Sequence, residues 1–184
     1  MHAAASCRTS GNNDITVGDT NVEGLVSIRT GRGNDTIRGG QRDDAALTDG
    51  EADADGENGH ATWGAAHIFD AGGANDIVLR NLAISGGGLT LRTAGRGRDS
   101  IRLIDIGVRG ETDILTGGGR DRLAIVDSVF GGPFALDMEW GDDVARVTGS
   151  TFEGPTEMLG GPGEDMLSET DNTFLGTFFE DFEL

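Results

Sequence analysis

Aspartates that recur at a nearly constant spacing are the residues of this chain best suited to chemistry. Most of them follow a glycine-rich stretch and precede a short apolar run, as in "TGRGNDTI" from Thr30 and "GGPGEDML" from Gly160. Successive members are 21, 41, 23, 22, 22 and 22 residues apart. They are Asp14, Asp35, Asp76, Asp99, Asp121, Asp143 and Asp165. Carboxylates brought together by such a period can bind a cation, accept backbone hydrogen bonds or pair with arginine.

A second motif, [D/N]-x-x-[I/V/F]-x-G, recurs between the aspartates. It reads "NLAISG" from Asn81, "DIGVRG" from Asp105 and "DSVFGG" from Asp127. Internal periods of 20 to 50 residues are typical of stacked repeats. The single spacing of 41 residues is one period plus an insertion of about 19 residues. We therefore expect one continuous repeat array with one interruption.

Apolar residues fall into three columns when the repeats are aligned. The first column is Ile37, Val78, Ile101, Leu123, Ala145 and Leu167. The second is Ile28, Ile68, Leu91, Ile114, Leu136 and Met158. The third is Val22, Ile84, Val108, Phe130, Phe152 and Phe174, whose three phenylalanines should stack along the axis. Three inward positions per repeat predict an all-β fold, a single-stranded parallel β-helix (β-solenoid) of about seven rungs of about 22 residues.

The rungs are expected to cover residues 1–177 and to coil right-handed, as parallel crossovers do. The acidic, glycine-rich stretch 41–65 has no period and should leave the rod as a lateral loop. Trp63 either anchors the return of this loop or serves as a ligand platform. Residues 178–184 contain Phe178, Phe179 and Phe182 and are expected to fold over the last rung as a cap, or to form a dimer contact at the C-terminal end.

Like charges stacked on one corner need neutralisation. At a rung spacing of about 5 Å, two carboxylates repel by roughly 3 kcal/mol at an effective dielectric of 20. One solution is that the aspartates accept backbone N–H groups of the turn. Another is pairing with the arginines beside them, Arg32, Arg96, Arg98, Arg120 and Arg122. The third is a bound cation.

The G-x-G-x-D turns resemble the nonapeptide repeat of RTX (hemolysin-type calcium-binding) proteins, G-G-x-G-x-D-x-U-x. The stretch "GGPGEDMLS" from Gly160 has the whole pattern, whereas "MEWGDDVAR" from Met138 departs most from it. The resemblance covers nine residues of each repeat and implies Ca²⁺ held between the aspartates of adjacent turns. Neighbouring Asn or Glu residues favour calcium near Asp14, Asp35 and Asp165, whereas arginines disfavour it near Asp99 and Asp121.

The insertion contains a separate candidate cation site. Asp53, Asp55 and Glu57 of "DADGENG" resemble the start of an EF-hand loop, although Thr62 stands where that loop has its twelfth-position glutamate. The alternative is an acidic loop without an ion. We count these three residues with the seven aspartates as candidate metal ligands.

Composition limits the classes of partner. The 184 residues carry a formal net charge of −18, and all 14 basic residues are arginine. Nucleic acid is not expected as a partner because phosphate binding needs a basic surface. No apolar run approaches the roughly 20 residues of a transmembrane segment.

Catalysis is not expected. Pectate lyases, polygalacturonases and alginate epimerases resemble the predicted architecture, but they use clusters that include Lys, Tyr or His. This chain has no Lys and no Tyr, and His2, His60 and His67 fall in the terminus or the insertion. We predict a non-catalytic extracellular or cell-surface module that binds Ca²⁺ and acts as a spacer, an adhesion element or a secretion-linked folding domain, with a glycan or cell-surface partner. The alternative is a small carbohydrate-binding or polysaccharide-modifying (lyase- or epimerase-like) β-helix.

Overall fold

The chain folds into a parallel β-solenoid of about seven turns, as the sequence predicts. The structure is a computed structural model that describes residues 11–18, 21–40 and 61–182. Strands stack in register at the repeat spacing, so that Leu123 pairs with Ala145 and Ala145 with Leu167. Within the described ranges there is no helix, and therefore none long and apolar enough to cross a membrane. Right-handed coiling stays a prediction.

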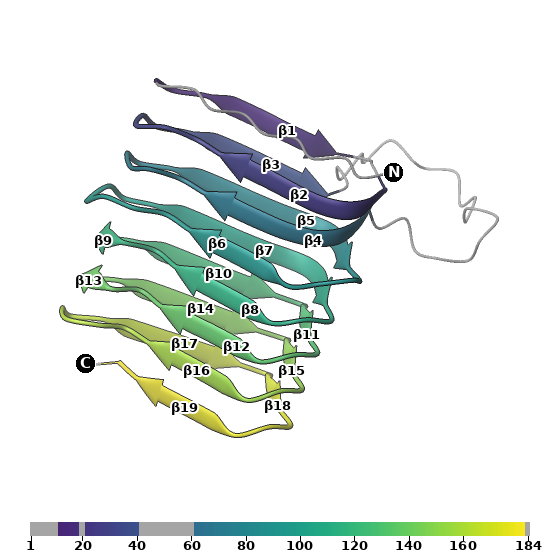
Figure 1. Ribbon diagram of the computed structural model, residues 1–184. Coiled ribbons are helices and arrows are strands. Elements are labelled where there is room, and N and C mark those ends of the chain that lie inside the picture. The colour runs from purple at the N-terminus through teal and green to yellow at the C-terminus, as the bar shows by residue number, and fades with distance from the viewer. Residues whose placement is uncertain (1–10, 19–20, 41–60, 183–184) are drawn as a thin grey trace, which may run out of the picture.

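Three rows of strands form the walls of the rod (Figure 1). The first sheet contains β1 (Asp14–Gly18), β3 (Thr36–Gly40), the first halves of β5 (Asp76–Ile84) and β7 (Ser100–Val108), β10 (Arg122–Val126), β14 (Val144–Thr148) and β17 (Met166–Thr170). The second sheet contains β2 (Val22–Arg29), β4 (Ala61–Phe69), β6 (Leu89–Arg92), β8 (Thr112–Leu115), β12 (Phe134–Asp137), β16 (Thr156–Leu159) and β19 (Phe178–Asp181).

A third, short row completes each turn. It consists of the first residues of β4 and the last residues of β5 and β7, followed by β11 (Val129–Phe130), β15 (Thr151–Phe152) and β18 (Thr173–Phe174). At the glycine-rich corner, β9 (Gly118–Gly119) pairs with β13 (Trp140–Gly141). Each turn therefore visits the first sheet, the short row, the second sheet and the glycine corner in that order.

The interior is built from the predicted apolar columns, with one correction. The second and third columns are confirmed by the strand pairing. In the first column the inward residue of β5 is Ile77, which pairs with Ile37 and Ile101, and the prediction of Val78 is wrong. The repeat there reads "ANDIV", so its aspartate lies one position later than Asp35 and Asp99 do in the adjacent turns. A fourth inward column, which the sequence reading missed, is Val17, Gly39, Leu79, Leu103, Ile125 and Val147.

Phenylalanines stack along the axis in the C-terminal half, as predicted. The ring of Phe152 lies 5.1 Å from that of Phe130 and 5.0 Å from that of Phe174, with interplanar angles of 14° and 11°. Phe134 of the second sheet meets Phe152 edge to face at 4.9 Å. Aromatic pairs in these geometries gain about 0.5–1.5 kcal/mol beyond the area they bury. This cluster therefore holds several turns together.

The insertion returns to the rod earlier than the sequence suggested. Strand β4 begins at Ala61, so residues 61–65 belong to the solenoid rather than to the loop. Trp63 is fully buried and occupies the third column between Val22 and Ile84, which confirms its role as the anchor of the returning chain. The rest of the insertion, with Asp53, Asp55 and Glu57, lies outside the described residues.

The C-terminal segment extends the rod. Residues Phe178–Asp181 form β19, which pairs in parallel with β16, whereas the sequence suggested that they fold across the end. The period continues because Phe178 follows Phe134 and Thr156 in one column. Phe178 and Phe182 are half-buried against the core.

Two glutamates close the apolar columns at this end of the rod. Glu169 follows Val147 in the fourth column, and Glu180 follows Met158 in the second. Burial, and then the charge of Glu180, raises the pKa of Glu169. Inward-facing charges on edge strands are a known protection against pairing with another chain. Oligomerisation through the C-terminal end stays a prediction. A contact between two such ends would bring Glu169 and Glu180 of both copies close together.

Candidate functional site

One ladder of carboxyl and amide side chains runs along the glycine corner. In each step, Oδ1 of an Asp or Asn accepts the backbone N–H of the residue at the same position in the preceding turn. The six distances are 2.8, 3.0, 2.9, 2.8, 2.6 and 2.8 Å. The members of this aspartate ladder are Asn13, Asp35, Asn75, Asp99, Asp121, Asp143 and Asp165. Of the three arrangements expected from the sequence, the structure shows the one in which the side chains accept backbone N–H groups.

The expectation that seven aspartates share this corner is wrong for two of them. Asp14 and Asp76 each lie one residue beyond the ladder, where Asn13 and Asn75 take their place. Both aspartates lie on the outer surface, and Asp76 pairs with Arg102 at 2.7 Å and Asp14 with Arg38 at 3.2 Å. Arginine therefore neutralises outward carboxylates rather than the ladder. Among the predicted arginines, Arg120 pairs with Asp142, a surface neighbour of the ladder.

The ladder carboxyls are buried. Asp35, Asp99, Asp121, Asp143 and Asp165 are all 3% exposed or less. Burial raises the pKa of Asp121 to about 7 and that of Asp143 to about 6, and in both cases the charges of neighbouring ladder aspartates add to the effect. The pKa of Asp99 is also raised by burial, against the backbone and side-chain hydrogen bonds from Asn75 that lower it. Asp121 and Asp143 thus bind protons at a higher pH than ordinary aspartates do.

The second carboxyl oxygens explain why protons are held there. Oδ2 of Asp121 and Oδ2 of Asp143 are buried without a hydrogen-bond partner. A neutral carboxyl is much less costly to bury than an ionised one. Where an asparagine precedes an aspartate, its amide supplies a second donor: Nδ2 of Asn75 donates to Oδ1 of Asp99 at 2.9 Å. Asp121 and Asp143 follow an aspartate in the ladder and receive no such amide.

A column of hydroxyls faces part of the ladder from the end of the second sheet. Oγ1 of Thr30 donates to Oδ2 of Asp70 at 2.5 Å, and Oγ1 of Thr93 donates to the carbonyl oxygen of Thr116 at 2.6 Å. Burial raises the pKa of Asp70 to about 6. Oγ1 of Thr116 donates to the carbonyl oxygen of Met138 at 2.9 Å, and the column of hydroxyls ends there because a buried methionine takes the next position.

Close approach of neighbouring turns explains the glycines of the G-x-G-x-D motif. A Cβ atom at Gly141 would overlap the carbonyl oxygen of Gly119, and one at Gly163 would overlap that of Gly141. The motif is therefore required for stacking at this corner, with no reference to a metal. The first position of the second motif also has a conformational role, because Asp105 and Asp127 have φ values of 52° and 49°. Asn and Asp tolerate this left-handed conformation better than other side chains do.

A second polar ladder was missed in the sequence. Oγ of Ser150 accepts the N–H of Ser128 at 3.1 Å, and Oδ1 of Asn172 accepts the N–H of Ser150 at 3.0 Å. These three residues are 22 positions apart, so the repeat could have revealed them. The solenoid thus uses the same device at two corners: a short polar side chain caps the backbone of the previous turn.

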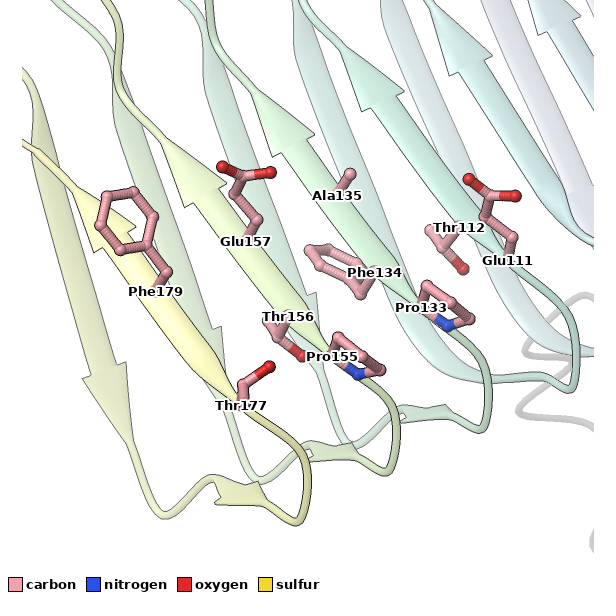
Figure 2. A pocket seen from close by; sticks show the side chains of 10 residues that line it. All are labelled: Glu111, Thr112, Pro133, Phe134, Ala135, Pro155, Thr156, Glu157, Thr177 and Phe179. Atoms are coloured by element: carbon pink, nitrogen blue, oxygen red, sulfur yellow. The ribbon is translucent and has the colours of Figure 1, made fainter.

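The outer surface carries two shallow depressions in the C-terminal half. One has a volume of about 310 Å³ and lies over β8, β12, β16 and β19, between Glu111, Glu157 and Phe179 (Figure 2). The other has a volume of about 640 Å³ and lies beside Trp140 at the glycine corner. Trp140 is 71% exposed, and the sequence reading did not single it out.

The carboxyls whose pKa is raised to about 6 or 7, which are Asp70, Asp121 and Asp143, line neither depression. His67, which the sequence reading placed in the insertion, is on β4, where its ring meets that of Phe69 edge to face at 6.4 Å. No group of three or more His, Cys, Asp or Glu side chains in the described part of the chain is arranged to hold a metal ion.

Comparison with known proteins gave no significant match to a family model, to a curated protein or to a solved structure.

Proposed function

We propose that this chain is a non-catalytic β-solenoid module that serves as a rigid, extended spacer and displays binding surfaces on its sides. One observation carries the proposal: Asp99, Asp121 and Asp143, whose pKa values burial raises, are enclosed in a hydrogen-bonded ladder that a substrate cannot reach. A general acid or base must come within hydrogen-bond distance of its substrate. Asp121 and Asp143, at 1% and 0% exposure, are placed to stabilise the stack rather than to transfer protons to a ligand.

The absence of activity can be measured on glycans, the substrates of many parallel β-helix enzymes. We expect no release of unsaturated product or of reducing ends when the protein is incubated with acidic and neutral polysaccharides. Lyase activity would oppose the proposal and favour the polysaccharide-modifying alternative. Such activity is assigned to a surface depression if it survives Asp143→Asn and disappears in a variant of a depression residue, such as Glu157→Gln.

Calcium at the aspartate ladder stays a proposal based on the resemblance to RTX repeats. Because each Oδ1 already accepts a backbone N–H, an ion has to use the second oxygens, such as Oδ2 of Asp121 and Asp143. Ca²⁺ needs six to eight oxygen ligands at about 2.3–2.6 Å, so it must also recruit carbonyl groups or water.

Melting curves with EGTA and with millimolar CaCl₂ test this proposal. A bound ion should raise the melting temperature of the wild type at pH 8 and leave that of Asp121→Asn/Asp143→Asn unchanged, since binding to the folded state alone is stabilising. Superimposable wild-type curves would remove calcium from the account and leave backbone N–H groups and protons as the stabilisers of the ladder.

An extracellular or cell-surface location, with a role in adhesion or in secretion-linked folding, belongs to the same proposal. Its support is the RTX-like pattern of the turns together with a rod-like fold suited to hold two partners apart. Fractionation of the producing cells into cytosol, surface and medium, followed by immunoblotting, tests the location, and a purely cytosolic signal would contradict it.

A further inference from the structure

The outer face of the second sheet carries arginines in its N-terminal half but not in its C-terminal half. In the N-terminal half, arginines of the chain itself cover the aromatic and acidic side chains. The guanidinium carbon of Arg29 lies 5.2 Å from the centre of the Phe69 ring, and Arg92 pairs with Asp113 at 2.6 Å. These residues occupy the two outward columns of the sheet.

The same two columns continue into the C-terminal half without arginine. One column continues as Ala135, Glu157 and Phe179, and the other as Asp137, Leu159 and Asp181. Figure 2 shows the side chains of Glu157 and Phe179 on neighbouring strands of this face. Within the described part of the chain, the three carboxylates here form no ion pair.

Exposed aromatic rings lie on both sides of these carboxylates. Phe179 is 57% exposed and belongs to the depression of about 310 Å³. Trp140 is 71% exposed and lines the depression of about 640 Å³ together with Asp137, Glu139 and Asp181. Neither depression is lined by a basic residue. We name the six residues Asp137, Glu139, Trp140, Glu157, Phe179 and Asp181 the acidic-aromatic face.

We propose that the acidic-aromatic face binds an arginine-bearing peptide segment of a partner protein. A guanidinium group can stack on Trp140 or Phe179 and pair with the adjacent carboxylates, as Arg29 and Arg92 do within the chain. The carboxylates are not arranged to enclose a metal ion, so a larger, planar cation fits them better. An extended peptide also matches a face that runs over β12, β16 and β19. This proposal goes beyond the spacer role and does not depend on it.

The test is fluorescence anisotropy with a dye-labelled tetra-arginine peptide at fixed ionic strength, with the neutral citrulline peptide as the comparison probe. We expect binding of the arginine peptide only. The double variant Asp137→Asn/Asp181→Asn should weaken it roughly tenfold, as expected for the loss of two exposed ion pairs next to an aromatic ring. Trp140→Ala should weaken it by roughly fivefold.

A charge-matched control separates a site from general attraction to an acidic protein. Asp127→Asn/Glu153→Gln removes the same charge from exposed positions outside the face and should change the affinity less than twofold. Asp137→Asn keeps the side-chain oxygen that accepts the N–H of Glu139 at 2.9 Å, so the local turn is preserved. Circular dichroism verifies that all variants are folded.

Three results would overturn the proposal: equal binding of the citrulline peptide, equal weakening by the control variant, or full binding after Trp140→Ala. Competition with a glucosamine oligomer identifies a different class of ligand. If this amino sugar displaces the peptide at a lower concentration than unlabelled tetra-arginine does, the face is a glycan site and the peptide proposal is wrong.

Discussion

The folded protein is expected to be more stable near pH 5 than near pH 8, by on the order of 3–5 kcal/mol. The pKa values of Asp70, Asp121 and Asp143 in the folded state, about 6, 7 and 6, lie above the ordinary value of 3.8. These groups bind more protons in the folded than in the unfolded chain. Their contribution to stability is therefore complete below about pH 4 and is lost as the pH rises through 6 to 7.

Other carboxyls act in the opposite direction at lower pH. A hydrogen bond from the N–H of Glu164 and the ion pair with Arg120 lower the pKa of Asp142. Its contribution to stability is present above pH 4 and is lost on further acidification. Urea denaturation at constant ionic strength should therefore show a maximum of stability between about pH 4 and 5.

The variant Asp143→Asn assigns the pH effect to the ladder. Asparagine keeps the acceptor for the N–H of Asp121 and can donate to Asp165 as Asn75 donates to Asp99. It should stabilise the protein by about 1–2 kcal/mol at pH 8 and have little effect at pH 5. Asp143→Ala removes the acceptor and should destabilise the protein by about 1–3 kcal/mol at both pH values.

A second cause of acid stabilisation has to be separated from the ladder. Relief of the overall charge of −18 also favours the folded state on acidification. Repeating the measurement in 1 M NaCl screens surface charges but leaves buried ones nearly unaffected. A pH dependence that disappears in salt, or that Asp143→Asn leaves unchanged, would contradict the ladder as its source.

Substitution of Phe152 by alanine is expected to destabilise the protein by about 3–5 kcal/mol, the range for large-to-small changes in a core. The ring is fully buried and contacts Phe130, Phe134 and Phe174. Solenoid stability is roughly a sum of turn and interface contributions, so the loss should concentrate on the turns that Phe152 joins. Hydrogen exchange should then accelerate in β17, β18 and β19 before it does in β5 and β7.

Phe179 provides the matched control because it is a phenylalanine of the same half of the rod with a mostly exposed ring. Phe179→Ala should change the free energy of unfolding by no more than about 0.5 kcal/mol. Denaturation followed by circular dichroism compares the two variants. A loss below about 1 kcal/mol for Phe152→Ala, or uniform acceleration of exchange along the rod, would show that the aromatic stack is not what joins the C-terminal turns.

The repeat period made most of the architecture predictable. A 22-residue spacing places Ile114, Leu136 and Met158 in one inward column, and the structure confirms that column from Ile28 to Met158. The errors occurred where a repeat was judged by its residue type instead of its position. The ladder needs a side-chain oxygen, which Asn13 and Asn75 supply as well as an aspartate does, so alignment on aspartate shifted two repeats by one residue.

The outer surface was far less predictable. Inward positions repeat because each must fill the same space in every turn, whereas outward positions have no such constraint. Trp140 stands in a column whose neighbours one turn away are Gly118 and Pro162, so no period marks it. The pairing of Arg29 with Phe69 and of Arg92 with Asp113 joins residues 40 and 21 positions apart, and only the observed register of β2, β4, β6 and β8 reveals it.

The central claim is that repeated turns stack into one rod and enclose a ladder of carboxyl groups, two of which, Asp121 and Asp143, have raised pKa values. Carbon-detected NMR of the aspartate side chains, followed from pH 3 to pH 9, measures this directly for each group. We expect the carboxyl carbons of Asp121 and Asp143 to titrate near pH 7 and pH 6, and that of Asp142 to titrate below the ordinary range of an aspartate. Titration of all three carboxyls below pH 4 would contradict the account.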